Sequence, residues 1–104
     1  LLNRMDPITK TADFTVSDIY DIYNVLGTAT VTVTLPAAAS YSGRVLHFKT
    51  LANFAIQASA AVVIPNNGTA VGQPIVAGGA GSAGNSTTIV SNGVSWIAVR
   101  TSVM

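Results

Sequence analysis

The sequence has no cysteine, no glutamate and few charges of either sign. Without cysteine, a disulfide framework and a thiolate metal site are both excluded, and the chain is indifferent to the redox compartment in which it folds. Charged residues make up 9% of the 104 residues, whereas ordinary soluble domains carry about 25%. A chain that is 49% hydrophobic and so sparsely charged either exposes much apolar surface or buries it against other subunits. We therefore expect an obligate oligomer.

The few charges are unevenly distributed. All four acidic residues, Asp6, Asp13, Asp18 and Asp21, lie in the first 21 positions, and the five basic residues are scattered along the chain. Scattered cations cannot neutralise a run of phosphates, so nucleic acid is not expected as a partner. The longest apolar stretch, residues 51–64, is interrupted by polar residues and is too short to cross a bilayer. Membrane insertion is therefore not expected either.

Residue types suited to catalysis are scarce. His47 is the only histidine, and it stands in an alternating strand pattern beside Phe48, where packing or a subunit contact explains it better than general-base chemistry. A glycosidase pair would have to come from the N-terminal aspartates, and no pattern places two of them across a cleft. Asp18 and Asp21 could hold calcium only together with main-chain carbonyls, because the EF-hand spacing is absent. We predict no enzyme activity, no cofactor and no metal site.

Glycine is concentrated in one stretch. Six of the nine glycines fall between Gly68 and Ser86, which favours a flexible loop around one short edge strand at 73–77. The run 78–84 superficially resembles a phosphate-binding loop, but neither a lysine nor a helical pattern follows it. The alternative is a loop tip that contacts a receptor or a neighbouring protein. The candidate contact residues are Tyr41, the one aromatic residue expected in a loop, with Gly78, Gly79, Gly81, Ser82, Gly84 and Asn85.

Strand-forming alternation is what the sequence has in abundance. Threonine and valine alternate from residue 30 until Pro36 removes a main-chain donor and ends the strand. Residues 44–50 alternate in the same way and place Leu46 and Phe48 on one face. Shorter segments rich in β-branched and aromatic residues predict further strands at 14–16, 19–25, 54–56 and 61–64.

A hairpin is the strongest local prediction. Residues 87–90 and 94–101 both read as strands and are joined through Asn92-Gly93. A two-residue turn at this pair would place Ile89 opposite Trp96.

Eight or nine short strands with frequent turns predict an all-β fold: a small antiparallel sandwich, a barrel or a β-prism. Residues 1–11 are expected to connect from a preceding region, and residues 12–104 to form a single domain with a glycine-rich loop at 66–86. The residues expected in the core or at a subunit interface are Val31, Val33, Leu35, Leu46, Phe48, Trp96, Ile97 and Val99.

Several markers in a fixed order carry a family resemblance. They are the opening segment 14–16 with Asp18, the strand exit at 31–36, Gly43-Arg44 before the strand 45–49, and the closing SNGVSW at 91–96. With these markers the chain resembles, from about Ala12 to Arg100, the small β-modules of bacteriophage tail fibres and tailspikes.

The resemblance implies a homotrimeric structural protein of the virion, in which three chains share a central apolar seam. Such modules hold fibres rigid, cap their ends or present receptor-binding loops, so the implied partners are other copies, other virion proteins and a host cell-surface glycan. Two alternatives stay open. One is a capsid decoration protein, a trimer that clamps neighbouring capsid subunits, and the other is a carbohydrate-binding module that shares a β fold.

Overall fold

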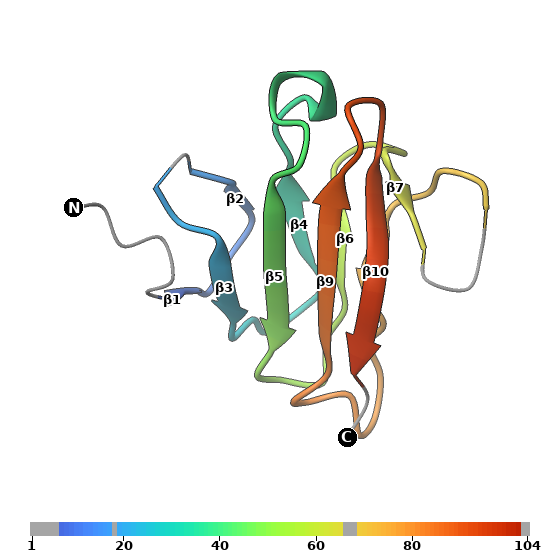
Figure 1. Ribbon diagram of the computed structural model, residues 1–104. Helices are drawn as coiled ribbons and strands as arrows, with labels where there is room; N and C mark the ends of the chain where they lie inside the picture. The colour runs from blue at the N-terminus through green and yellow to red at the C-terminus, as the bar shows by residue number, and fades with distance from the viewer. Residues whose placement is uncertain (1–6, 18, 66–68, 103–104) are drawn as a thin grey trace.

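Ten strands form two mixed β-sheets that face each other within residues 7–17, 19–65 and 69–102, which the computed structural model describes (Figure 1). The larger sheet, sheet A, has the strand order β1 (Pro7–Lys10), β3 (Ile22–Val25), β5 (Val45–Thr50), β9 (Ser86–Ser91), β10 (Trp96–Ser102) and β7 (Val63–Ile64). The smaller sheet, sheet B, has the order β2 (Phe14–Thr15), β4 (Val31–Thr34), β6 (Ile56–Ala58) and β8 (Pro74–Val76). A 3-10 turn, η1 (Ala38–Ser40), is the one helical element in this part of the chain. The predicted all-β class is confirmed.

The chain alternates between the two sheets as it enters the fold. Strands β1, β3 and β5 are parallel neighbours in sheet A, and β2, β4 and β6 are parallel neighbours in sheet B. Each consecutive pair of strands, β1–β2, β3–β4 and β5–β6, therefore forms one coil, and the three coils lie side by side. Antiparallel strands follow: β9 pairs with β5, β10 with β9, and β8 with β6.

The expectation of antiparallel sheets is correct for three of the eight strand pairings in the described residues, and the other five are parallel. Parallel neighbours need a crossover connection, which is usually a helix. Here the connection between two parallel neighbours in one sheet passes through a strand of the opposite sheet: β2 lies between β1 and β3 along the chain, and β4 lies between β3 and β5. Alternation of polar and apolar residues is the same in both strand directions, so the sequence pattern could not reveal this.

Residues 7–10 were expected to belong to a connector, but they form β1 at the edge of sheet A. The predicted edge strand in the glycine-rich stretch is confirmed as β8, which lies at the edge of sheet B. Asp6, Asp18 and residues 66–68 lie outside the described part of the chain.

Most of the predicted core is confirmed. Val31, Val33, Leu46, Phe48 and Trp96 are buried, and Leu35 packs against them partly buried. The Trp96 indole N–H donates to the carbonyl of Pro36 at 2.9 Å, which satisfies its one polar group.

The last two core candidates lie on the outer face of sheet A. Because Trp96 and Ala98 point inward, alternation directs Ile97 outward, where it is partly buried. A bulge between Ala98 and Arg100 leaves Val99 without a partner on β9, and its side chain is 55% exposed. The prediction that Val99 lies in the core was therefore wrong, and its predicted role in a subunit contact stays a prediction.

The β9–β10 hairpin is confirmed, but its register differs from the prediction. Trp96 pairs with Ser91 rather than with Ile89. A two-residue turn of the expected kind needs positive φ at both central residues, and in the described chain only glycines have positive φ, Gly93 among them at 89°. The Asn92 carboxamide oxygen accepts main-chain hydrogen bonds from two and three residues later, at 2.9 and 2.8 Å. These bonds hold a four-residue loop in place of the tight turn.

Three aromatic rings stack across the coils inside the fold. The Phe14 ring centroid lies 5.1 Å from that of Tyr23, and the Tyr23 centroid lies 5.5 Å from that of Phe48. The interplanar angles are 22° and 17°. Tyr23 and Phe48 are fully buried, whereas Phe14 is partly buried. Each such pair contributes about 0.5–1.5 kcal/mol beyond the burial of area.

Two buried threonines provide a matched test of the core. Among the described residues the Thr87 hydroxyl has no hydrogen-bond partner, whereas the Thr50 hydroxyl donates toward the carbonyls of Ala52 and Phe54 at 2.8 and 3.0 Å. We expect Thr87→Val to raise the free energy of unfolding by about 1 kcal/mol and Thr50→Val to lower it by about as much. Urea denaturation measures both. A Thr87→Val variant less stable than wild type would contradict this account of the hydroxyl.

Candidate functional site

A hollow of about 470 Å³ opens beside the start of β5. Its lining residues come from the residue directly before β3, from the loop between β4 and β5, and from β5. They are Asp21, Tyr41, Ser42, Gly43, Arg44, Val45 and His47. Tyr41 was predicted as a contact residue, and it forms part of this wall. The sequence analysis did not predict that Asp21 and Arg44 share a site. The signal that could have indicated it is the small number of charged residues in the chain, because few charges leave few possible ion pairs.

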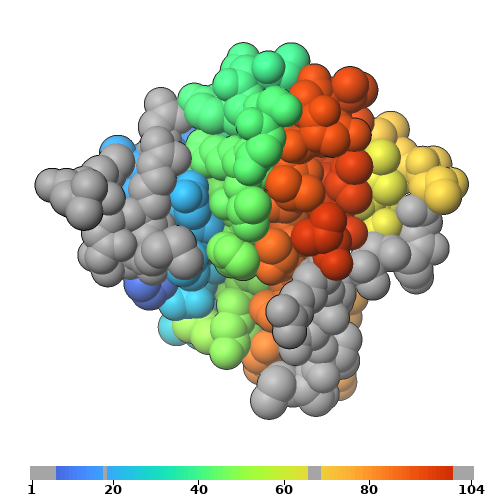
Figure 2. All heavy atoms as spheres, viewed as in Figure 1, coloured from blue at the N-terminus to red at the C-terminus, as the bar shows by residue number. Residues whose placement is uncertain are grey.

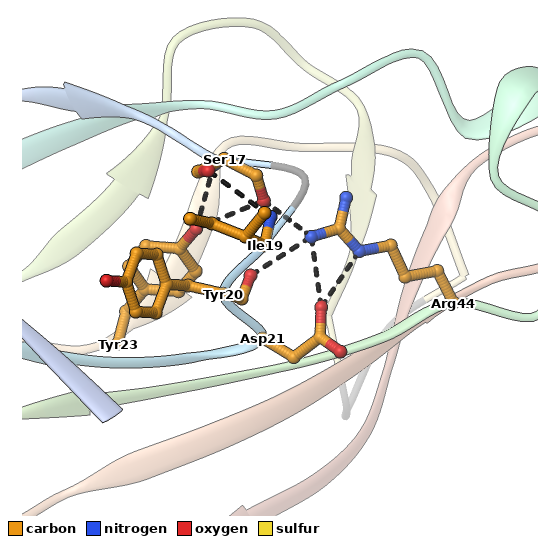
Figure 3. A network of polar contacts seen from close by, with 6 residues as sticks. All are labelled: Ser17, Ile19, Tyr20, Asp21, Tyr23 and Arg44. Atoms are coloured by element: carbon orange, nitrogen blue, oxygen red, sulfur yellow. Dashed lines mark hydrogen bonds and ion pairs between the residues drawn. The ribbon is translucent and has the colours of Figure 1, made fainter. Parts of the chain in front are cut away.

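Two of the lining residues, Asp21 and Arg44, form an ion pair that is largely buried (Figure 3). The Arg44 Nε and Nη2 atoms each lie 3.0 Å from Oδ1 of Asp21, and Nη2 also donates to the carbonyls of Ser17 and Tyr20 at 2.7 and 3.0 Å. The side chains are only 6% and 16% exposed, respectively. A guanidinium this deeply buried needs such partners, because an uncompensated charge there is very costly. Arg44 therefore connects Ser17, Tyr20 and Asp21 to the start of β5.

The Tyr23 hydroxyl completes this network. It accepts a hydrogen bond from the Ser17 N–H at 2.8 Å and lies 3.4 Å from the Ser17 carbonyl (Figure 3). Burial raises the pKa of Tyr23 above 10.0, and this outweighs the lowering by the Ser17 hydrogen bond and the Arg44 charge. The hydroxyl is therefore neutral near pH 7 and can serve as both donor and acceptor.

The loop that carries Tyr41 is held at several points. Its ring centroid lies 5.1 Å from the guanidinium carbon of Arg44, a cation–π geometry. The Gly43 N–H donates to the carbonyl of Ser91 at 2.8 Å, and the Arg44 N–H donates to that of Tyr41 at 2.9 Å. Gly43 has φ of 86°, which other residues rarely adopt. The hollow thus presents an aromatic ring, an ion pair and the hydroxyl of Ser42 on a defined backbone.

His47 lies at the edge of the hollow on the outer face of sheet A. It is in register with Ile22 on β3 and with Thr88 on β9. Its Nδ1 lies 2.9 Å from the Thr88 hydroxyl, so the imidazole is already hydrogen-bonded within the sheet. This is consistent with a strand residue that packs beside its neighbours.

The glycine-rich contact residues are not part of the hollow. The Gly84 N–H donates to the carbonyl of Thr50, which ends β5, whereas Tyr41 precedes the start of that strand. Six residues of strand separate these points by roughly 20 Å. Tyr41 and the 78–85 segment therefore belong to opposite ends of the fold.

Only part of the 78–85 segment is accessible. Gly78, Gly79 and Gly81 are exposed, and Gly84 is partly buried. Ser82 and Asn85 are 5% and 7% exposed, so their side chains are not available for the partner contact that was predicted. A Cβ at Gly78 would lie 2.3 Å from the Ala55 nitrogen, because the segment packs closely on the loop before β6.

A second feature is an apolar row on the outer face of sheet A. Val45 pairs with Val90, Val90 with Ile97, and Ile97 with Ile64, so four neighbouring strands each contribute one side chain. Alternation directs all four outward, since Leu46, Ile89, Trp96 and Val63 point inward. In Figure 2, β5, β9 and β10 form one continuous surface on this face. We call the four residues the outer apolar row.

Comparison with protein-family models, with curated proteins and with solved structures finds no match for the chain. In the described part of the chain no helix is long and apolar enough to span a membrane. The same residues contain no group of three or more histidine, cysteine or acidic side chains able to share a metal ion. The hollow beside Tyr41 and the outer apolar row are two surface features of the described residues that bear on function.

The ion pair between Asp21 and Arg44 predicts a strong effect of one substitution. Asp21→Asn removes the carboxylate charge that lies 3.0 Å from the buried guanidinium, so we expect it to lower the free energy of unfolding by about 3 kcal/mol. Asp13→Asn is the control, because Asp13 is exposed and its Oδ1 accepts from the Thr32 N–H at 2.8 Å, a role the amide oxygen can keep. Denaturant unfolding compares the two. Equal stability of both variants would exclude a supporting role for the ion pair.

Proposed function

We propose that the chain is a structural module of a bacteriophage virion, of the tail fibre or tailspike type, that assembles as a homotrimer and contacts other virion proteins. The observation that carries this proposal is the outer apolar row. The module acts by forming rigid contacts between copies and not by transforming a substrate.

The composition of the outer face supports an interface between copies. The centres of protein interfaces are depleted in charged residues and rich in apolar contacts. The outer apolar row places Val45, Val90, Ile97 and Ile64 in one line across sheet A, and Val45 is 38% exposed. Val99, which is 55% exposed on β10, extends the apolar surface beside this line.

Low charge supports the same conclusion. The last 83 residues of the chain contain three basic residues and no acidic one. In a monomer with so few charges, little electrostatic repulsion would prevent the apolar surfaces of different molecules from associating. A trimer buries these surfaces between its subunits. In the proposed trimer the outer apolar rows of three copies meet along a shared seam.

Light scattering across a dilution series tests this assembly. We expect a particle of three times the 10.6 kDa chain mass that resists dilution. Ile97→Lys places a charge in the outer apolar row and should reduce the particle to monomers, whereas Thr34→Lys, on the exposed outer face of sheet B, should leave it trimeric. Circular dichroism verifies that both variants are folded. A monomeric wild type would refute the trimer, and a folded trimeric Ile97→Lys variant would refute this interface.

A second candidate function is favoured by the hollow beside Tyr41. Aromatic faces with neighbouring polar groups are suited to sugar rings, which have apolar faces and hydroxyl edges. The hollow combines the Tyr41 ring with Ser42, His47 and the Asp21–Arg44 pair. A host cell-surface glycan bound here would make the module a receptor-binding part of the virion.

Glycan binding has its own test. We expect saturable binding of a host cell-surface glycan, at least tenfold weaker in Tyr41→Ala, because the variant lacks the ring that forms one wall. Val94→Ala is the control, since Val94 is 83% exposed and does not line the hollow. Binding to immobilised glycans measures both variants. Equal binding of wild type and Tyr41→Ala would exclude this site.

A further inference from the structure

The stack of three coils has two different ends. Strands β9 and β10 extend sheet A beyond the last coil, and β8 extends sheet B in the same direction with antiparallel pairing. The outer edge strand there, β7, is already bonded, because Val63 exchanges two main-chain hydrogen bonds with Gly72 at 2.9 and 2.7 Å. At the opposite end, β1 and β2 are the edge strands of the two sheets (Figure 1). We call this the open end.

At the open end, the main-chain N–H and C=O groups of Thr9 on β1 point away from the sheet. The Lys10 carbonyl accepts a hydrogen bond from the Leu26 N–H at 2.9 Å, so Lys10 and, by alternation, Ile8 bond toward β3. Main-chain groups of successive residues in a strand point to opposite sides. The N–H and C=O of Thr9 therefore point away from β3, along the edge where a further strand would pair.

The open end repeats a strand register that is found inside the fold. The Phe14 ring stacks on Tyr23 with one face and is partly buried, and Ile8 packs partly buried against the core. Phe14 lies on β2 and stacks on Tyr23 from the opposite sheet, whereas Ile8 on β1 is in register with Tyr23 just as Tyr23 is in register with Phe48. A further parallel strand on β1 would therefore continue the series in which β1 pairs with β3 and β3 pairs with β5.

The charge at the open end selects the partner. The Lys10 ammonium lies 5.6 Å from the Phe14 ring centroid, over the ring. Two copies joined edge to edge about a twofold axis would bring two such ammonium groups together, and lysine on an edge strand is a common way to prevent pairing of identical chains. An acidic side chain on a different polypeptide would meet this cation favourably.

We propose that the open end is the docking surface for a fourth coil supplied by a different protein. The occupant is an extended segment that runs parallel to β1, carries an acidic residue beside Lys10 and places an apolar residue against Phe14. Its main chain bonds to Thr9, as β1 bonds to β3. This contact is independent of the outer apolar row, because it extends the sheets sideways and leaves their outer faces unchanged.

A peptide tests the proposal with the full chain. The probe is a synthetic peptide with the sequence of residues 7–16 carrying Lys10→Glu, which supplies a strand pair of the β1–β2 type and the acidic residue. Nuclear magnetic resonance follows amide exchange at Thr9 and the ring signals of Phe14. We expect saturable binding, at least tenfold slower exchange of the Thr9 amide, and at least tenfold weaker binding of the peptide that retains lysine.

Thr9→Pro in the protein provides the decisive variant. Proline removes the outward N–H but no bond to β3, and edge strands tolerate it there, so the fold should persist while peptide binding is lost at least tenfold. Thr34→Lys is the matched control and should bind as wild type does. Three results would overturn the proposal: no saturable binding at about 1 mM peptide, undiminished binding by Thr9→Pro, or self-association of the wild-type chain that Thr9→Pro abolishes, which would identify a second copy as the occupant.

Discussion

The stack of Phe14, Tyr23 and Phe48 is the interaction on which the rest of the structure depends. The three rings come from three different coils, so their contact joins β1–β2, β3–β4 and β5–β6 into one body. Because side chains alternate across a strand, directing Phe48 inward also directs His47 outward, and a slip of one residue would reverse every position. The outer apolar row and the outward position of His47 both follow from this one choice of faces.

A second constraint is the hydrogen-bond network around Arg44 and Tyr23. Residues 17 and 19–21 do not belong to a strand, and hydrogen bonds of Ser17 and Tyr20 with Arg44 and Tyr23 stabilise this part of the chain in place of strand pairing. Arg44 stands directly before β5, so the same guanidinium that pairs with Asp21 also supports the Tyr41 ring. The shape of the hollow therefore depends on the buried guanidinium of Arg44, which contacts both Asp21 and Tyr41.

Period-2 alternation was sufficient to predict β4 and β5 and their buried faces, since Val31, Val33, Leu46 and Phe48 all point inward. It could not predict the parallel pairings, because alternation is the same whichever way the neighbouring strand runs. The hairpin register could not be predicted because it depends on the backbone of Asn92, which does not adopt positive φ. The exposure of Val99 could not be predicted because it depends on a bulge in β10. Of the candidate site, Tyr41 was predicted from its loop, but its neighbour Asp21 is 20 residues away and joins it only through the pairing of β3 with β5.

The two proposed contact surfaces lie in different directions, and this bears on how such a module could build a particle. The outer apolar row lies on the face of sheet A, whereas the open end lies along the edges of both sheets. A face contact between identical copies can close into a ring, because it needs only apolar surface and a rotation axis. An edge contact is directional, because its hydrogen bonds and the Lys10 charge require one strand direction and one sign of partner. In the proposed assembly the face therefore determines how many copies associate, and the edge determines which different protein they join.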